Sequence, residues 1–235
     1  MDKFWGPRPE VADYVAQSIP PGASVLEIGP GHVPFARSTH FVDRLARTGL
    51  PGPLRMADVV REPLPFSDKQ FDFVYCRHVV EDLAYPDLLL SEMSRVGRAG
   101  YVETPSPVAE MTRGVDGPRY GRNTPYRGYI HHRWIVWVLN GVLQLTEKAN
   151  AIEHLDLFQV EAGGDLRRPL AWNTYLLWRD SLAFKRREHD IDYNLHTGYR
   201  EELLAAHAAG KRNETQIREL LTSSSGNAKN VHAPS

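Results

Sequence analysis

Three acidic residues and two glycines are spaced so that they could bind a nucleoside ligand. Glu27 lies two residues before Gly29-Pro30-Gly31, and Asp43 and Asp58 each end a later short segment of mostly apolar residues. Glycines let a ligand approach the backbone because no Cβ obstructs it. Carboxylates accept hydrogen bonds from ribose hydroxyls and from an adenine amino group. If these segments are parallel strands, their carboxyl ends meet at one crevice, where open α/β sheets bind ligands.

The glycine turn alone does not define the ligand, because dinucleotide-binding folds and ordinary tight turns share it. A nucleotide-dependent oxidoreductase should show a full Gly-x-Gly-x-x-Gly, and Pro34 stands at the last glycine position. That reading is therefore disfavoured. Each carboxylate taken singly is equally well explained as a solvated strand end or a helix cap. Their joint spacing favours a ligand site.

Three histidines are candidates for a catalytic base. His78 comes just after an apolar segment at residues 71–76, and imidazole titrates near neutral pH. The alternative is that His78 only packs beneath the ligand. His131 and His132 begin an expected hairpin, in which one of two neighbours would face inward. Metal ligation by these histidines and Glu81 is conceivable on residue type, but no His-x-x-x-His motif is present, so no metal site is predicted.

Two further groups of side chains could contact a substrate. The tryptophans could frame an aromatic or sugar ring, although core packing is the commoner role: Trp134, Trp137, Trp172 and Trp178. Arginines in a segment rich in Pro and Gly at residues 105–129 could bind an anion, or they could be solvated: Arg113, Arg119, Arg122 and Arg127. We expect this segment to be a substrate loop.

The elements that would position these residues alternate between strands and helices. Apolar residues at helical spacing predict helices over 9–18 and 86–96, and a helix is expected to open at 33–37. Short apolar runs predict five strands: 24–28, 40–43, 54–58, 71–76 and 100–104. The helix between the second and third strands must be short or missing. This order predicts an α/β fold of Rossmann type with a mostly parallel sheet.

Beyond the substrate loop, the pattern predicts antiparallel pairing at the C-terminal edge of the sheet. Asn140-Gly141 suits a type I′ turn between strands at 130–138 and 142–146. Capping elements should complete residues 130–190, including a helix over 169–187, and residues 200–209 are a further helix candidate. Residues 1–222 are expected to form one domain. The segment 223–235, rich in Ser, Gly, Asn and Ala, is expected to be disordered.

Composition favours a globular chain and argues against a nucleic-acid partner. The 235 residues are 42% hydrophobic and 24% charged, typical of a globular chain. Lys and Arg (28) nearly balance Asp and Glu (29), so a nucleic-acid partner is not expected. The single cysteine, Cys76, excludes an intramolecular disulfide. With neither a signal peptide nor an apolar run of about 20 residues, we expect a cytoplasmic protein without a membrane span.

Four segments together resemble a known enzyme family. They are residues 25–31 (Val-Leu-Glu-Ile-Gly-Pro-Gly), Ala57-Asp58, residues 64–72 (Leu-Pro-Phe-Ser-Asp-Lys-Gln-Phe-Asp) and residues 77–83 (Arg-His-Val-Val-Glu-Asp-Leu). The joint pattern, over roughly residues 20 to 105, is similar to the type 11 group of class I S-adenosylmethionine (SAM)-dependent methyltransferases. The resemblance implies that SAM is the cofactor.

The resemblance also implies roles for individual residues. Glu27, Gly29, Pro30 and Gly31 would line the methionine end of SAM, Asp43 the ribose, Ala57 and Asp58 the adenine, and Arg77 and His78 the sulfonium side. The sequence departs from the family at two places. His32-Val33-Pro34 replaces a further glycine found in many members, and Asp82 stands where a second histidine is common.

The sequence therefore predicts methyl transfer from SAM to a small molecule or glycan, with oxygen as the favoured acceptor atom because a base and a polar loop are expected. A catalytically silent protein of the same fold, which binds a partner through its aromatic C-terminal part, is the alternative. The set of Glu27, the glycines and Asp58 argues against that alternative. Nothing in the sequence indicates the oligomeric state.

Overall fold

A computed structural model describes residues 7–116, 125–155, 165–187 and 195–229. Its main sheet has six strands in the order β3-β2-β1-β4-β5-β8. The strands are β1 (Val25–Ile28), β2 (His40–Asp43), β3 (Leu54–Met56), β4 (Phe73–Arg77), β5 (Ala99–Pro105) and β8 (Asn173–Arg179). The first five pair in parallel, and β8 pairs with β5 antiparallel. The α/β fold with a mostly parallel sheet is confirmed.

The predicted hairpin forms, but it belongs to a second sheet rather than to the edge of the main one. Strand β6 (Trp134–Leu139) pairs antiparallel with β7 (Val142–Glu147), which pairs in parallel with β9 (Phe184–Arg187). Asn140 and Gly141 both have positive φ, at 50° and 76°, which a type I′ turn requires. The main sheet instead ends at β8.

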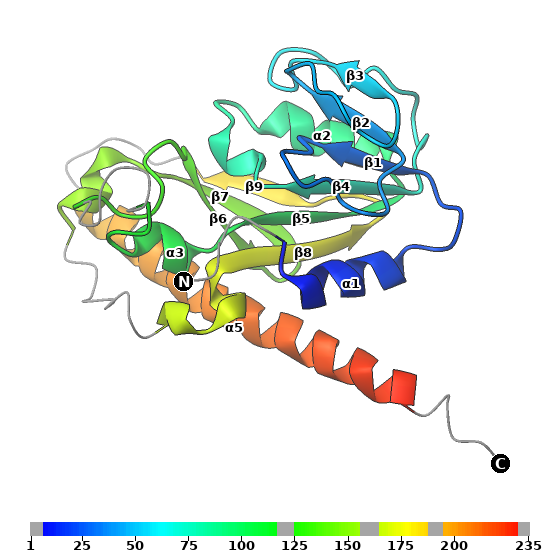
Figure 1. Cartoon of the computed structure of the whole chain (residues 1–235). Coiled ribbons are helices and arrows are strands. Elements are labelled where there is room, and N and C mark those ends of the chain that lie inside the picture. The colour runs from blue at the N-terminus through cyan, green and yellow to red at the C-terminus, as the bar shows by residue number, and fades with distance from the viewer. Residues whose placement is uncertain (1–6, 117–124, 156–164, 188–194, 230–235) are drawn as a thin grey trace.

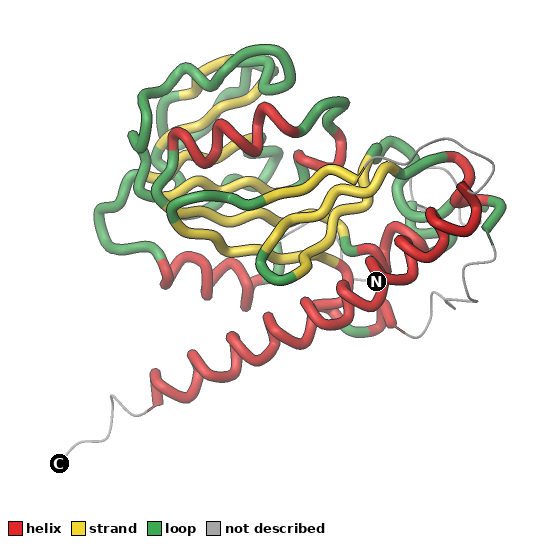
Figure 2. The backbone as a smooth tube through the Cα atoms, turned by 180° about the vertical axis from the view of Figure 1, so that it is seen from behind, coloured by secondary structure: helices red, strands yellow, loops and turns green. Residues whose placement is uncertain are grey.

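Helices cover both sides of the main sheet, as Figures 1 and 2 show. Helices α1 (Pro9–Ser18) and α5 (Leu195–Lys229) lie on one side, and α2 (Asp87–Val96) lies on the other. A short helix α3 (Pro107–Met111) follows β5. The 3-10 helices are η1 (Val80–Asp82), η2 (Asn150–Glu153), η3 (Asp165–Arg167) and η4 (Pro169–Trp172). Among the described residues, no helix is both long enough and apolar enough to cross a membrane.

Alternation along the buried strands divides the core into two layers. In β4, Phe73 and Tyr75 face α1 and the distal part of α5, where they pack with Val15 and Ile217. Val74 and Cys76 face the opposite side and pack with α2 and with the second sheet. The second sheet therefore extends the layer begun by α2 and widens the surface near the carboxyl ends of β4 and β5.

Three expected elements differ in the structure. Residues 33–37 form no helix, because Pro34 lacks an N–H and the preceding Gly29 and Gly31 both have positive φ. The helix expected over 169–187 is replaced by η4, β8 and β9. Helix α5 includes the expected 200–209 helix, and it continues to Lys229, so the expected disorder from Ser223 is wrong for the described part of that segment.

Candidate active site

Glu27 lies in β1 at the base of the predicted crevice and is almost fully buried, at 3% exposure. Both of its carboxylate oxygens accept the Phe35 backbone N–H, at 3.1 and 3.0 Å. Burial raises the pKa of Glu27 above its usual 4.5, although hydrogen bonds from Ser38 and Phe35 and the charge of Arg77 oppose the rise. The carboxylate therefore ties the loop after β1 back to the strand and keeps lone pairs for a ligand.

Glu27→Gln is expected to weaken SAM binding while preserving the fold. Glutamine keeps an acceptor for the Phe35 N–H but loses the charge that would attract the methionine ammonium. A hydrogen bond to a charged group contributes about 1.5–3 kcal/mol, so the dissociation constant for SAM should rise by about 10- to 150-fold. Calorimetric titration with SAM measures this change. An unchanged affinity would remove Glu27 from the cofactor site.

The same variant tests the raised pKa of Glu27. A carboxyl whose pKa is higher in the folded state binds its proton more tightly there, so its stabilising contribution is present below 4.5 and is lost as pH rises through the folded-state pKa. The free energy of unfolding of wild type relative to Glu27→Gln should thus decrease over that rise. Denaturant titrations at pH 4 and pH 7 provide the comparison.

The glycine turn and Asp43 are joined by one arginine. Asp43 Oδ2 accepts from Arg47 Nε, Asp43 Oδ1 accepts from the Leu45 N–H at 2.9 Å, and Arg47 Nη1 donates to the Gly31 carbonyl at 3.2 Å. The two oxygens of an ionised carboxylate together have about four lone-pair sites. Asp43 therefore retains acceptor capacity for ribose hydroxyls while Arg47 holds it beside the turn.

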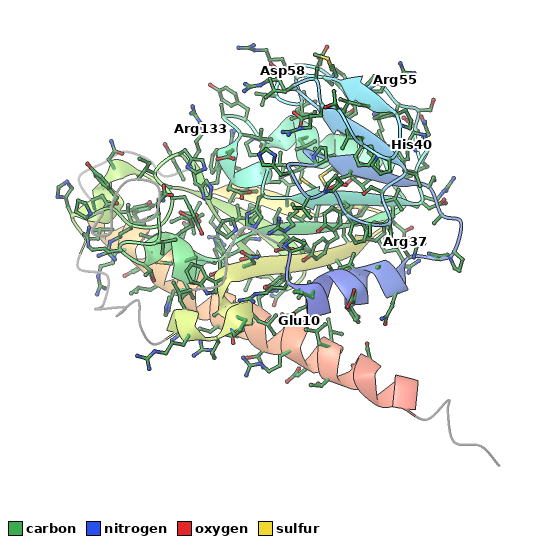
Figure 3. The ribbon with its side chains drawn as sticks, viewed as in Figure 1. Glu10, Arg37, His40, Arg55, Asp58 and Arg133 are labelled. Carbon is green, nitrogen blue, oxygen red and sulfur yellow. The ribbon has the colours of Figure 1, made fainter. Side chains whose placement is uncertain are left out.

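Ala57 and Asp58 follow β3 and connect to the same rim. Ala57 is buried, and its N–H donates to the Asp43 carbonyl at 3.1 Å. Asp58 is half-buried at the outer rim beside β3, as Figure 3 shows. Its carboxylate accepts the Val60 N–H and Arg61 Nη1, both at 3.2 Å. This is the bonding of a turn-capping aspartate, with capacity left for an amino group.

Arg77 ends β4 and His78 follows it, next to a carboxylate that the sequence did not predict as part of the site. Glu103, in β5, is 1% exposed and accepts from Arg77 Nε at 3.2 Å, from the Tyr101 hydroxyl at 2.7 Å and from Asn173 Nδ2 at 2.5 Å. Glu103 lies near the end of β5, as Asp43 ends β2, and this position in the sequence could have marked it as a site residue. Glu103 fixes the arginine that borders the crevice.

His78 is held by Glu81, three residues later. Its Nδ1 lies 3.0 Å from Glu81 Oε1, and its backbone has a φ of +52°. Glu81 is 1% exposed. While Glu81 is ionised it can only accept, so Nδ1 carries the proton and the lone pair is on Nε2. This Nε2 is buried and has no hydrogen-bond partner among the described residues.

His132 is buried and His131 is exposed, with 5% and 38% of their side chains accessible, so one of the two faces inward as expected, although both approach the same carboxylate. They lie in the turn before β6, which begins at Trp134, and strand alternation does not apply there. Their Nε2 atoms lie 3.7 and 3.8 Å from Asp82 Oδ1. Burial raises the pKa of Asp82 to about 6, and the nearby Glu81 carboxylate adds to the rise.

A buried polar group supports His132 from behind. Glu110, in α3, is fully buried; it bonds to His132 Nδ1 at 2.6 Å and accepts from Lys148 Nζ at 2.7 Å. Burial alone would raise the pKa of Glu110, but Lys148 and His132 outweigh it and hold that pKa below its usual value. Conversely, Glu110 raises the pKa of His132 against the effect of burial. The charged forms of both groups are therefore favoured together.

The tryptophans mostly serve the core. Trp134, Trp137 and Trp178 are at most 8% exposed, and Trp172 is partly buried against a small cluster around α3.

The two described loop arginines have structural partners within the chain. Arg113 pairs with Glu153, and Arg127 donates to the Met111 and Leu155 carbonyls. Arg119 and Arg122 lie outside the described residues.

Comparison with known proteins gives one family match. Residues 26–101 match the family described as "Methyltransferase domain", and this match implies SAM as the cofactor. The matched range contains Glu27, the glycine turn, Asp43, Asp58 and His78. No curated protein matches the chain.

Several solved structures are similar to part of this chain. A SAM-dependent methyltransferase from Aquifex aeolicus is 15% identical with a TM-score of 0.34, and the match covers 41% of this chain and 64% of that one. One from Mesorhizobium loti is 15% identical with a TM-score of 0.34, covering 42% and 54%. A proposed methyltransferase from Haloferax volcanii, in complex with the activator Trm112, is 15% identical with a TM-score of 0.41, covering 73% and 91%. The chain spans about half to two thirds of the first two.

Proposed function

We propose that this chain, whose residues 26–101 match a methyltransferase-domain family, transfers the methyl group of SAM to a hydroxyl oxygen of a small molecule or glycan. The observation that carries the choice of oxygen is the His78–Glu81 pair at the carboxyl end of β4. An alcohol is a weak nucleophile until its proton is removed, and a histidine fixed by a carboxylate is a recurring general base.

SAM is proposed to lie along the carboxyl ends of the strands. Glu27 and the glycine turn would hold its methionine part, Asp43 its ribose and Asp58 its adenine. Arg77 and His78 would border the sulfonium. This arrangement uses acceptors at the ends of β1, β2 and β3, where the ligand crevice of an open parallel sheet lies.

The reaction follows from the chemistry of the sulfonium. When bound, SAM would supply an electrophilic methyl group that an acceptor oxygen could take from sulfur, with S-adenosylhomocysteine as the other product. His78 Nε2 would take the hydroxyl proton of the acceptor. Because the sulfonium is already a good leaving group, alignment supplies much of the acceleration.

A panel of hydroxyl acceptors tests the proposal through formation of S-adenosylhomocysteine. Phenols, aliphatic alcohols and sugars should include at least one acceptor that gives turnover above the background with SAM alone. Amines and thiols of matched shape should give less. A protein that binds SAM but turns over none of these acceptors would instead be the catalytically silent alternative.

His78→Asn is expected to lower kcat by about 10²–10⁴-fold with a nearly unchanged dissociation constant for SAM. Asparagine tolerates the positive φ of this position but cannot take the proton. His154→Asn, at an exposed histidine outside the site, is the control. A kcat within twofold of wild type for His78→Asn would rule out the base.

A further inference from the structure

We propose that Asp82, His131 and His132 bind a divalent transition-metal ion, which the sequence did not predict. One atom from each residue lies within 4.8 Å of the other two. Atoms that ligate the same zinc ion at about 2.0–2.2 Å lie roughly 3–3.5 Å apart. The observed separations of 3.7 and 3.8 Å between Asp82 Oδ1 and the two imidazoles are therefore close to that geometry. Small side-chain rotations would complete it.

The hydrogen bond between His132 Nδ1 and the Glu110 carboxylate is of the kind that metal-binding histidines commonly make. Its Nδ1 lies 2.6 Å from Glu110 Oε1, and Lys148 keeps that carboxylate paired. A ligating histidine usually gives its other ring N–H to a carboxylate or carbonyl, which fixes the tautomer. Glu110 thus holds His132 with Nε2 toward Asp82.

The charge around the triad also favours a cation. Glu81 and Glu110 are buried near Asp82, which adds a third carboxylate. Lys148 pairs with Glu110. Within the described residues, Glu81 Oε2 is buried without a hydrogen-bond partner. A bound dication would offset this negative charge.

The ligand set points to the chemical class of the ion. Two imidazoles and one carboxylate suit Zn²⁺, Co²⁺, Fe²⁺ or Mn²⁺, whereas Mg²⁺ and Ca²⁺ prefer all-oxygen sites. The side chains of Asp82 and His131 are 43% and 38% exposed, so an ion can enter from solvent. Three protein ligands leave coordination positions for water or an acceptor oxygen. The site adjoins Glu81, the partner of the proposed base.

Metal titration of the untagged full chain, after removal of metal with a chelator, tests the proposal. Zn²⁺ measured by calorimetry should bind at one ion per chain with a dissociation constant in the micromolar range or below. Co²⁺ should give visible absorption bands of an imidazole-ligated ion. Neither readout depends on methyltransferase activity. Binding of less than one ion per chain would overturn the site.

Asp82→Ala and His131→Ala are the informative variants, because both residues are partly exposed and their loss leaves the Glu110–Lys148 pair intact. Each should weaken Zn²⁺ binding at least 10-fold and remove the Co²⁺ bands, with unchanged circular dichroism. His154→Ala is the matched control at an exposed histidine and should bind like wild type. Unchanged affinity in both informative variants, or loss in the control alone, would place the ion elsewhere.

Discussion

Lys148→Met is expected to lower the free energy of unfolding by about 3–5 kcal/mol, the usual cost of removing one partner from a buried ion pair. Lys148 Nζ donates to Glu110 Oε2 and to the Tyr129 carbonyl, both at 2.7 Å. The side chains of Lys148 and Glu110 are 7% and 1% exposed. Methionine fills similar space but leaves the carboxylate of Glu110 buried beside His132 alone. Denaturant unfolding followed by circular dichroism measures the loss.

Two further variants separate charge from packing at Lys148. Lys185→Met changes an exposed lysine of β9 and should stay within about 0.5 kcal/mol of wild type. Lys148→Met combined with Glu110→Gln removes both charges and should recover part of the stability, because no ionised group is then stranded. If Lys148→Met costs no more than Lys185→Met, the pair contributes nothing to the fold.

The Lys148–Glu110 ion pair illustrates which parts of the site can be predicted from the sequence and which cannot. Glu27, Asp43 and Asp58 are recognisable because each ends or nearly ends a local apolar run, and the parallel sheet brings such ends together. Glu110, His132 and Lys148 come from α3, a turn and the end of β7, and no local pattern relates them. Their convergence depends on how the second sheet packs, which a one-dimensional pattern does not contain.

The secondary structure was likewise predictable for some elements and not for others. Strands β1, β2, β4 and β5 and helices α1 and α2 were predicted to within a few residues, because their apolar periods are clear. Strand β8 was expected to be a helix, since its residues alternate poorly. Most of β8 is buried on both faces, between the α2 side and the α5 side of the sheet. A strand buried in this way cannot be told from a buried helix by period alone.

The turn that carries His131 and His132 shows how one boundary alters a site. The sequence placed both in a strand from residue 130, where neighbours point to opposite faces. Because β6 begins at Trp134, both imidazoles reach Asp82, and their ring centroids are 4.4 Å apart. His132 is still the inward member of the pair, but the later start of β6 lets the exposed His131 reach Asp82 as well, which completes a candidate metal triad.

Gly29→Ala is expected to lower the free energy of unfolding by about 2–5 kcal/mol and to weaken SAM binding at least 10-fold. Gly29 has a φ of +65°, which costs an alanine roughly 1–2 kcal/mol. An added Cβ would also lie 2.6 Å from Val79 Cγ2, and overpacking of this kind costs about 1–3 kcal/mol. Relief of the contact would push Val79, and with it His78, away from the glycine turn.

Two further variants separate the backbone strain at Gly29 from the steric conflict between an added Cβ and Val79. Gly22→Ala has a similar φ of +74° with nothing within 4 Å of its added Cβ, so it should show the strain alone and bind SAM normally. Gly29→Ala with Val79→Ala should regain the steric part of the stability and some SAM affinity. Denaturant titration and SAM calorimetry measure both quantities. Equal losses of stability and SAM affinity in Gly29→Ala and Gly22→Ala would show that the turn tolerates a side chain toward Val79. Close packing between the glycine turn and the segment that carries His78 would then not shape the cofactor site.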